Sequence, residues 1–262
     1  MCVTCGCGEI SKNSHSHEHP SKEGTLPHVH DCAQKQTEIS VTNERLVQLE
    51  EDVLAANDKV AVENRFFFKT NHILALNLVS SPGSGKTSLL CKTIEKLSKT
   101  IPVGVIEGDQ QTFNDAERIQ ATGVEALQIN TGEGCHLEAQ MIHQALHHPV
   151  VKKDSVLFIE NVGNLVCPAS FDLGEFCKVV VLSVTEGEDK PLKYPYMFSA
   201  SRVMLLNKID LLPYVNFDTQ KCIEYAKRVN PDIEVFEVSA TTEEGLDQWI
   251  SWIQRHYSEI EE

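Results

Sequence analysis

From about residue 73 onward, the apolar residues of this chain gather in short runs that end in turn or polar residues. Four such runs are "ILALNLVS", "VGVIEGD", "SVLFIE" and "RVMLLN". Unbroken apolar runs of this length are typical of strands that are buried on both faces, as in a parallel sheet covered by helices. The pattern therefore predicts an α/β fold with a mostly parallel sheet and helices on both faces.

Two further segments repeat apolar residues with helical spacing. The first predicts an amphipathic helix over about residues 42–64, which packs on the main domain or faces a partner. Its apolar face consists of Leu46, Leu49, Val53, Ala56 and Val60. The second pattern runs from Glu244 through Tyr257 and predicts a helix whose apolar face belongs to the core. That face consists of Leu246, Trp249, Ile250 and Ile253.

Residues 1–40 contain almost no apolar run and predict a flexible tail, which leaves residues 41–262 as the folded domain. The tail begins "MCVTCGC", so Cys2, Cys5 and Cys7 lie within reach of one metal ion, and histidines follow between residues 15 and 30. Thiolates with the α-amine suit square-planar nickel or copper as well as tetrahedral zinc. The alternative is that a polar terminus acquired these residues without a metal role.

The whole-chain composition narrows the classes of partner. The formal net charge is -15 and the basic residues form no stripe, which argues against nucleic acid. The chain has no apolar stretch of membrane-spanning length and its N-terminus lacks the apolar core of a signal peptide, so we expect no membrane insertion and a cytoplasmic protein. Nine cysteines in that compartment point to thiolates and metals rather than disulfides.

The stretch "SSPGSGKTSLL" places a glycine-bearing turn between a predicted strand and a predicted helix. In that context the turn is typical of a phosphate-binding loop, in which backbone N–H groups surround the phosphates, the lysine reaches the β and γ oxygens and the threonine holds Mg²⁺. The pattern expects glycine where this chain has Ser80. The predicted loop residues are Gly83, Ser84, Gly85, Lys86, Thr87 and Ser88.

Two further strands end in carboxylates, at the edge where open α/β sheets bind their ligands. Asp109 follows "VGVIEG" and is the first candidate to hold Mg²⁺ or to position water, and Glu160 ends "SVLFIE" where a Walker B acid would stand. Gly163 follows three residues later, and its backbone N–H is expected to sense the γ-phosphate. We therefore predict Lys86, Asp109, Glu160 and Gly163 as the catalytic group.

The segment "RVMLLNKID" predicts the base-reading element. Asn207, Lys208 and Asp210 follow a buried strand, and the Asp210 carboxylate can accept both the N1–H and the N2–H of guanine. Adenine lacks that pair of donors, so a site built around this carboxylate favours GTP. The backbone N–H groups of Ser239 and Ala240 are predicted to meet the guanine carbonyl.

Cys135 and His136 stand side by side in "TGEGCHLEAQ", where a glycine-rich turn meets a helix. Thiolate and imidazole are soft metal ligands, so the pair can be a metal site. Isolated cysteines are more often small buried apolar residues, and a histidine can be a hydrogen-bonded core residue. Spacing alone leaves both interpretations open.

Taken together, the motifs "MCxxCGC", "SPGSGKT", "EGDxxT", "GxxCH", "ENVGNLVCPA", "EGEDKPLKYP" and "NKIDLLP" resemble one family. It is the nickel-incorporation GTPase of nickel-iron hydrogenase maturation, the HypB-type accessory protein. The resemblance implies a P-loop NTPase fold and a metal-sensitive GTPase that dimerises across its nucleotide face and helps deliver Ni²⁺ to the hydrogenase large-subunit precursor. It further implies a small nickel-binding maturation factor as a partner, with a peptidyl-prolyl isomerase as another candidate.

The resemblance also implies a metal site formed by Cys135, His136 and Cys167. Because Cys167 lies four residues beyond Gly163, movement of that loop on hydrolysis would move a metal ligand and couple nucleotide state to metal affinity. Zn²⁺ competes with Ni²⁺ for such ligands. No arginine or glutamine is evidently placed to accelerate hydrolysis, which predicts slow turnover. Lys190 and Lys193 either reach a dimer partner's phosphates or only solvate a loop.

Two rival functions remain at this point. One is a urease-type nickel GTPase of the same superfamily, against which the "MCVTCGC" start argues. The other is a metal buffer or sensor whose nucleotide pocket is only regulatory.

Overall fold

The structure is a computed structural model that describes residues 32–109, 114–132 and 134–261. The chain divides into two compact units, Met1–Ala55 and Ala56–Glu262. All described strands belong to the second unit, which is the subject of the paragraphs below. The predicted tail ligands Cys2, Cys5 and Cys7 lie outside the described residues.

The second unit is built on one sheet of seven strands in the order β3-β2-β4-β1-β5-β6-β7. Every neighbouring pair is parallel, which confirms the predicted parallel sheet. β1 lies between β4 and β5, so the strand order reverses around the strand that leads into the glycine turn, where open parallel sheets bind ligands. The strands are β1 Ile73–Ser80, β2 Val103–Asp109, β3 Ala126–Asn130, β4 Ser155–Glu160, β5 Cys177–Ser183, β6 Ser201–Asn207 and β7 Glu234–Glu237.

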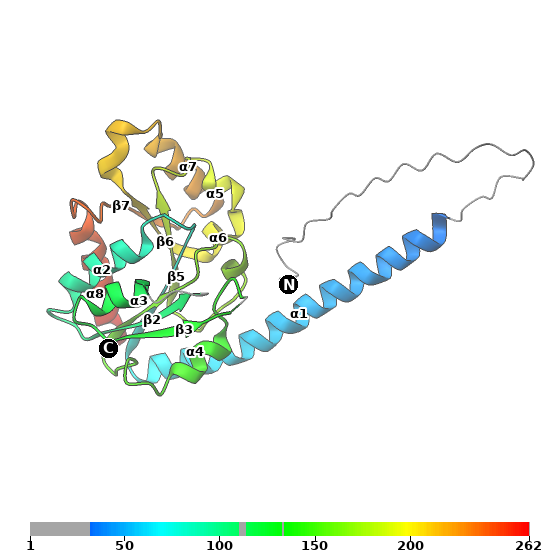
Figure 1. Ribbon diagram of the computed structural model, residues 1–262, viewed down its shortest axis with the longest axis horizontal. Helices are drawn as coiled ribbons and strands as arrows, with labels where there is room; N and C mark the ends of the chain where they lie inside the picture. The colour runs from blue at the N-terminus through cyan, green and yellow to red at the C-terminus, as the bar shows by residue number, and fades with distance from the viewer. Residues whose placement is uncertain (1–31, 110–113, 133, 262) are drawn as a thin grey trace, which may run out of the picture. The chain divides into compact units, whose positions relative to one another are not determined.

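Helices cover both faces of this sheet, as predicted (Figure 1). Successive side chains of a strand point to opposite faces, so Leu74 and Leu76 pack with α2 and α8 while Ile73 and Ala75 pack with α4. None of the described helices is long and apolar enough to cross a membrane. The helices are α1 Cys32–Thr70, α2 Lys86–Leu97, α3 Asn114–Gln120, α4 Ala139–Ala145, α5 Lys190–Lys193, α6 Pro195–Ala200, α7 Thr219–Val229 and α8 Leu246–Glu261, with 3-10 turns η1 Cys167–Ala169 and η2 Ile209–Tyr214.

The predicted C-terminal helix is α8, and its four predicted core residues are all buried. Trp249 illustrates the packing, since its ring stacks at 5.3 Å on that of Trp252 and its indole N–H donates to Thr93 Oγ1 at 3.2 Å. An indole buried with its N–H satisfied adds apolar area without the cost of an unpaired donor.

The N-terminal helix differs from its prediction in extent and in the face that it buries. α1 runs from Cys32 to Thr70, so residues 32–40, which the sequence assigned to the tail, are helical. Within the second unit Ala56 of the predicted apolar face is exposed. The buried face instead carries Asn57, Ala61, Asn64 and Phe68. Asparagines occupy it because neighbouring loops present backbone groups that need hydrogen-bond partners.

Candidate functional site

The predicted phosphate-binding loop contains two glycines in the left-handed region of the backbone. Gly83 and Gly85 adopt φ of 77° and 89°, a region that favours glycine. At Gly85 a Cβ would lie 2.7 Å from Asn207 Nδ2, so the loop also lacks space for a side chain there. Ser80, which replaces the expected glycine, is not among the described residues with positive φ, and its hydroxyl donates to Ser81 O at 2.9 Å. The serine therefore fits without backbone strain.

The loop lysine and threonine converge on Glu160 at the end of β4. Lys86 Nζ and Thr87 Oγ1 both contact Glu160 Oε1 at 2.6 Å. Glu160 is 1% exposed, and its second oxygen has no hydrogen-bond partner. The structure thus brings together three residues that the sequence placed in one phosphate and Mg²⁺ site.

A second buried carboxylate, Glu107 on β2, lies opposite Glu160 in the strand register. Burial, together with the charges of Glu160 and Asp109, raises the pKa of Glu107 to about 8. Glu107 Oε2 is buried without a hydrogen-bond partner. Carboxylate and hydroxyl oxygens crowded in this way match the ligand preference of Mg²⁺, so the donors present fit that ion. Asp109 ends β2 beside them, as predicted, and residues 110–113 lie outside the described chain.

The predicted base-reading residues also support the phosphate loop. Asn207 Nδ2 donates to Ser84 O at 3.0 Å, and Asn207 Oδ1 accepts from Ala240 N at 3.3 Å. Lys208 adopts a left-handed φ of 65°, and its Nζ donates to Gly83 O at 2.7 Å. The end of β6 therefore fixes the loop that follows β1.

Ser239 differs from its predicted role. Its backbone N–H already donates to Glu244 O at 3.0 Å, so that group is not directed at a base. Its hydroxyl instead donates to Asp210 Oδ1 at 2.6 Å and accepts from the N–H groups of Thr241 and Thr242. Ser239 thus orients the carboxylate that the sequence assigned to guanine recognition.

The two remaining predicted loop serines have different surroundings. Ser84 is 1% exposed, and its hydroxyl has no hydrogen-bond partner. Ser88 lies on α2, where its Oγ accepts from Arg118 Nη2 at 2.8 Å. Of these two serines, Ser84 is therefore the one whose hydroxyl has no hydrogen-bond partner.

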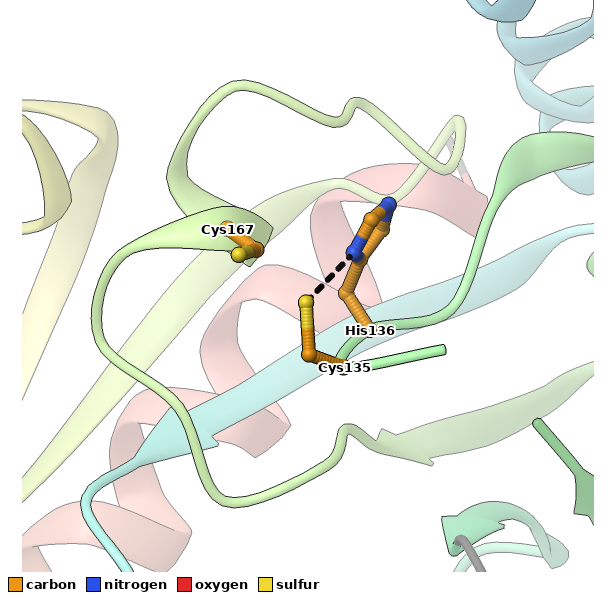
Figure 2. Close-up of side chains that lie close together, drawn as sticks. All are labelled: Cys135, His136 and Cys167. Atoms are coloured by element: carbon orange, nitrogen blue, oxygen red, sulfur yellow. Dashed lines mark hydrogen bonds between the residues drawn. The ribbon is translucent and has the colours of Figure 1, made fainter. Parts of the chain in front are cut away.

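The proposed soft-ligand site is assembled in three dimensions. Cys135, His136 and Cys167 each offer a ligand atom, and these atoms lie within 4.8 Å of one another (Figure 2). Cys135 and His136 come from the segment before α4, whereas Cys167 begins η1, after β4. Cys135 Sγ lies 3.5 Å from His136 Nδ1. Residues 32 positions apart in the sequence thus form one set of soft donors.

The surroundings of His136 suit a metal ligand. The His136 ring lies 3.9 Å from the Phe171 ring centroid, and burial lowers the pKa of His136. A lowered pKa keeps the imidazole neutral near pH 7, which is the form that binds metal. Its Nε2 lies 3.9 Å from Glu138 Oε1. That distance is too long for a hydrogen bond, and Nε2 is buried without a hydrogen-bond partner, whereas Nδ1 faces Cys135 Sγ.

Gly163 lies directly against the phosphate loop. A Cβ on this residue would be 3.3 Å from the N, Cα and Cγ atoms of Pro82. The segment between Glu160 and Cys167 therefore contacts the nucleotide site at one end and carries a soft donor at the other.

Comparison with known proteins identifies the family. Residues 74–237 match the family described as "CobW/HypB/UreG, nucleotide-binding domain". Hydrogenase maturation factor HypB from Escherichia coli K12 is 51% identical over 286 residues, covering 97% of this chain and 98% of that protein. This chain belongs to the HypB family.

Two solved HypB structures agree with this assignment. HypB from Archaeoglobus fulgidus has a TM-score of 0.73 and 37% identity, covering 78% of this chain and 99% of that one. HypB from Helicobacter pylori, solved in complex with nickel, has a TM-score of 0.73 and 38% identity, covering 78% and 96%. The resemblance drawn from the motifs is confirmed, and so is the fold of a GTP-binding P-loop domain.

In this HypB-family chain, asparagines of α1 hold the segments around the soft donors. Asn57 Oδ1 accepts from Ala139 N at 2.9 Å, and Asn64 Nδ2 donates to Ala139 O at 2.9 Å and to Leu173 O at 3.0 Å. Arg65 adds an ion pair with Asp172 at 2.6 Å. Sequence reasoning missed these residues, although Asn57 and Asn64 are seven positions apart and so share one helix face.

Proposed function

We propose that this chain is a metal-regulated GTPase that binds nickel and assists its insertion into the precursor of the nickel-iron hydrogenase large subunit. One observation carries the proposal. The segment that begins at Glu160, in contact with Lys86, passes Gly163 and ends at Cys167 beside Cys135 and His136. One short segment thus serves both the phosphate site and the soft-ligand site.

In the proposed hydrolysis, Lys86 neutralises charge that develops on the β and γ phosphates, together with the backbone N–H groups of the loop. Thr87 and Asp109 would hold Mg²⁺, which when bound would neutralise more of the phosphate charge. Glu160 positions Lys86 and Thr87, which it contacts. Gly163 N–H senses the γ-phosphate. Arg118 contacts the start of α2 but already donates to Ser88, so it is not free to act on the phosphates, which supports slow turnover.

Asp210 selects guanine in this proposal. Its carboxylate is held by the Ser239 hydroxyl at 2.6 Å, so its orientation is set before a base arrives. A preoriented carboxylate accepts the two N–H donors of guanine and is left unpaired by adenine, which disfavours ATP.

The nickel ion is the cargo of the reaction. Cys2, Cys5 and Cys7 capture it in the N-terminal tail, and Cys135, His136 and Cys167 form the site whose affinity depends on nucleotide. Mixed thiolate and imidazole ligation also suits Zn²⁺, which competes at the second site.

The proposal includes a homodimer formed across the nucleotide face. Lys190 and Lys193 lie on α5, where they pair with Glu186 at 3.7 Å and Asp189 at 2.7 Å. The Lys193–Asp189 pair is exposed and contributes little, so Lys193 remains available for a partner's phosphates, whereas Lys190 and Glu186 are half-buried. The other partners are a small nickel-binding maturation factor, the large-subunit precursor and a peptidyl-prolyl isomerase, all in the cytoplasm.

The deciding experiment is complementation of hydrogenase activity in a host that lacks its own copy of this protein. We expect Lys86→Ala and Cys167→Ser each to abolish maturation, whereas the exposed control Lys153→Ala supports it. Normal maturation with Lys86→Ala would instead indicate a metal buffer. Co-purification of a urease precursor, with no hydrogenase precursor, would favour the urease-type GTPase.

A further inference from the structure

One buried side chain joins the phosphate site to the soft-ligand site. Asn161 follows Glu160 directly and is 1% exposed. Its Oδ1 accepts from Leu137 N and from Val162 N, both at 3.0 Å. Leu137 follows His136 in the chain, and Val162 precedes Gly163. A single amide oxygen therefore holds the residue after a soft donor and the residue before the candidate γ-phosphate sensor.

The orientation of this carboxamide is fixed from its other side. Asn161 Nδ2 donates to Asn77 Oδ1 at 3.3 Å, and Asn77 Nδ2 donates to Glu175 Oε1 at 3.0 Å. Glu175 is in turn bound by Lys178 Nζ at 2.9 Å. All four side chains are buried. Because each group has a donor or acceptor role that cannot be reversed without breaking a bond, the Asn161 oxygen stays directed at Leu137.

Leu137 is held by its side chain as well as by its backbone. It is fully buried, and a Cβ on Gly108 would lie 2.7–2.9 Å from three of its side-chain carbons. Gly108 stands between Glu107 and Asp109 at the end of β2. Leu137 thus packs against the end of β2 and is hydrogen-bonded to Asn161, which follows the end of β4. Closely packed contacts of this kind transmit displacements.

A second asparagine makes a weaker contact of the same type. Asn164 Nδ2 donates to Cys135 O at 3.4 Å, and Asn164 Oδ1 accepts from Val166 N at 2.8 Å. Val166 immediately precedes Cys167. The segment that follows β4 therefore contacts both chain regions that supply soft donors.

From these contacts we propose that Asn161 is the positioning residue that couples nucleotide state to metal affinity, through the hydrogen bond from Leu137 N. This inference rests on the proposed function and names the residue that performs its coupling. A nucleotide-dependent shift at Gly163 moves the Asn161 oxygen, and Leu137 carries His136 and Cys135 with it. Linkage requires that metal binding change the relative affinities for GTP and GDP by the same factor.

The test measures zinc affinity with GDP and with a non-hydrolysable GTP analogue, and takes the ratio of the two dissociation constants. The full chain is used as the parent, with three tail substitutions, Cys2→Ser, Cys5→Ser and Cys7→Ser, so that the thiols of the predicted tail site do not compete. Nucleotide affinity is measured for every variant to confirm saturation. Nickel is the second probe.

The informative variants are chosen by whether they offer Leu137 N an accepting oxygen. Asn161→Ala removes the accepting oxygen, and we expect the ratio to fall to within about 2-fold of unity from the 5- to 150-fold range that is common for allosteric coupling. Asn161→Asp gives up the donor to Asn77 Oδ1 but keeps an accepting oxygen for Leu137 N, and we expect it to retain the ratio of the parent. The matched control Asn230→Ala loses three side-chain hydrogen bonds, to Phe198 O, Ser201 O and Asp232 N, without touching either site.

Asn161→Ser replaces the alanine variant if the latter does not fold, because its hydroxyl is polar yet too short to reach Leu137 N. If the parent shows a ratio different from unity and Asn161→Ala or Asn161→Ser keeps that ratio, the role of Asn161 is refuted and the proposed function stands. An aspartate variant with a ratio as low as that of alanine refutes it too. A parent ratio of unity refutes the coupling within the proposed function, and this inference with it.

Discussion

Glu107 provides a quantitative test of the electrostatics of the phosphate site. It is 2% exposed and lies opposite Glu160, and these surroundings raise its pKa from 4.5 to about 8. Without nucleotide and divalent cations, the folded chain keeps the Glu107 proton over a pH range in which the unfolded chain releases it. The stability from this group is present below the unfolded pKa and is lost as pH rises through the folded pKa.

The size of the effect follows from these two pKa values. Between about pH 6 and about pH 8.5, a carboxyl with a folded pKa of about 8 and an unfolded pKa of 4.5 lowers the free energy of unfolding by about 2.5 kcal/mol. The interaction of Glu107 with Glu160 spreads this titration over a wider pH range, so we expect the free energy of unfolding to fall by about 1–2.5 kcal/mol between the two pH values. Glu107→Gln keeps the shape of the side chain but cannot ionise, so this part of the pH dependence should disappear.

Urea unfolding of the parent and of Glu107→Gln, with a chelator and at both pH values, measures this difference. The control Glu237→Gln changes an exposed strand position and should keep the pH dependence of the parent. Added Mg²⁺ should stabilise the parent at the higher pH, since the ion favours the ionised carboxylates. Equal pH dependence in the parent and in Glu107→Gln would show that the carboxyl is not held protonated and would refute the reasoning.

Three further changes test the site and its support. Ser239→Ala removes the donor to Asp210 and should weaken GDP binding about 10-fold in a calorimetric titration, corresponding to a hydrogen bond to a charged group; unchanged affinity would show that Asp210 needs no positioning. Gly108→Ala forces a Cβ against Leu137 and should cost about 1–3 kcal/mol of unfolding free energy in urea. An unchanged denaturation midpoint would contradict that close packing. Asn64→Ala leaves the carbonyls of Ala139 and Leu173 without this donor and should cost about 1–3 kcal/mol by the same assay, whereas a loss below about 0.5 kcal/mol would mean that water replaces the amide.

The sequence predicted the sheet and its phosphate loop because both depend on local patterns. Unbroken apolar runs require burial on both faces, and a glycine turn between a strand and a helix has few other uses. For α1 the same reasoning left open whether the apolar face packs on the domain or faces a partner, and Ala56 of that face is exposed. The buried side chains there include Asn57 and Asn64. Their burial depends on distant loop carbonyls and N–H groups, which no periodicity records.

The sequence by itself determined the motifs on which the proposed chemistry rests, because the phosphate loop, the strand-end acids and the carboxylate proposed to select guanine are each short motifs. The tertiary structure decided which of these parts lie in contact. It brought Cys167 to Cys135 and His136, turned the Ser239 hydroxyl toward Asp210, and placed the Asn161 oxygen on Leu137 N. Such contacts join residues from separate strands, so their geometry follows from the register and packing of the sheet and cannot be read from local spacing.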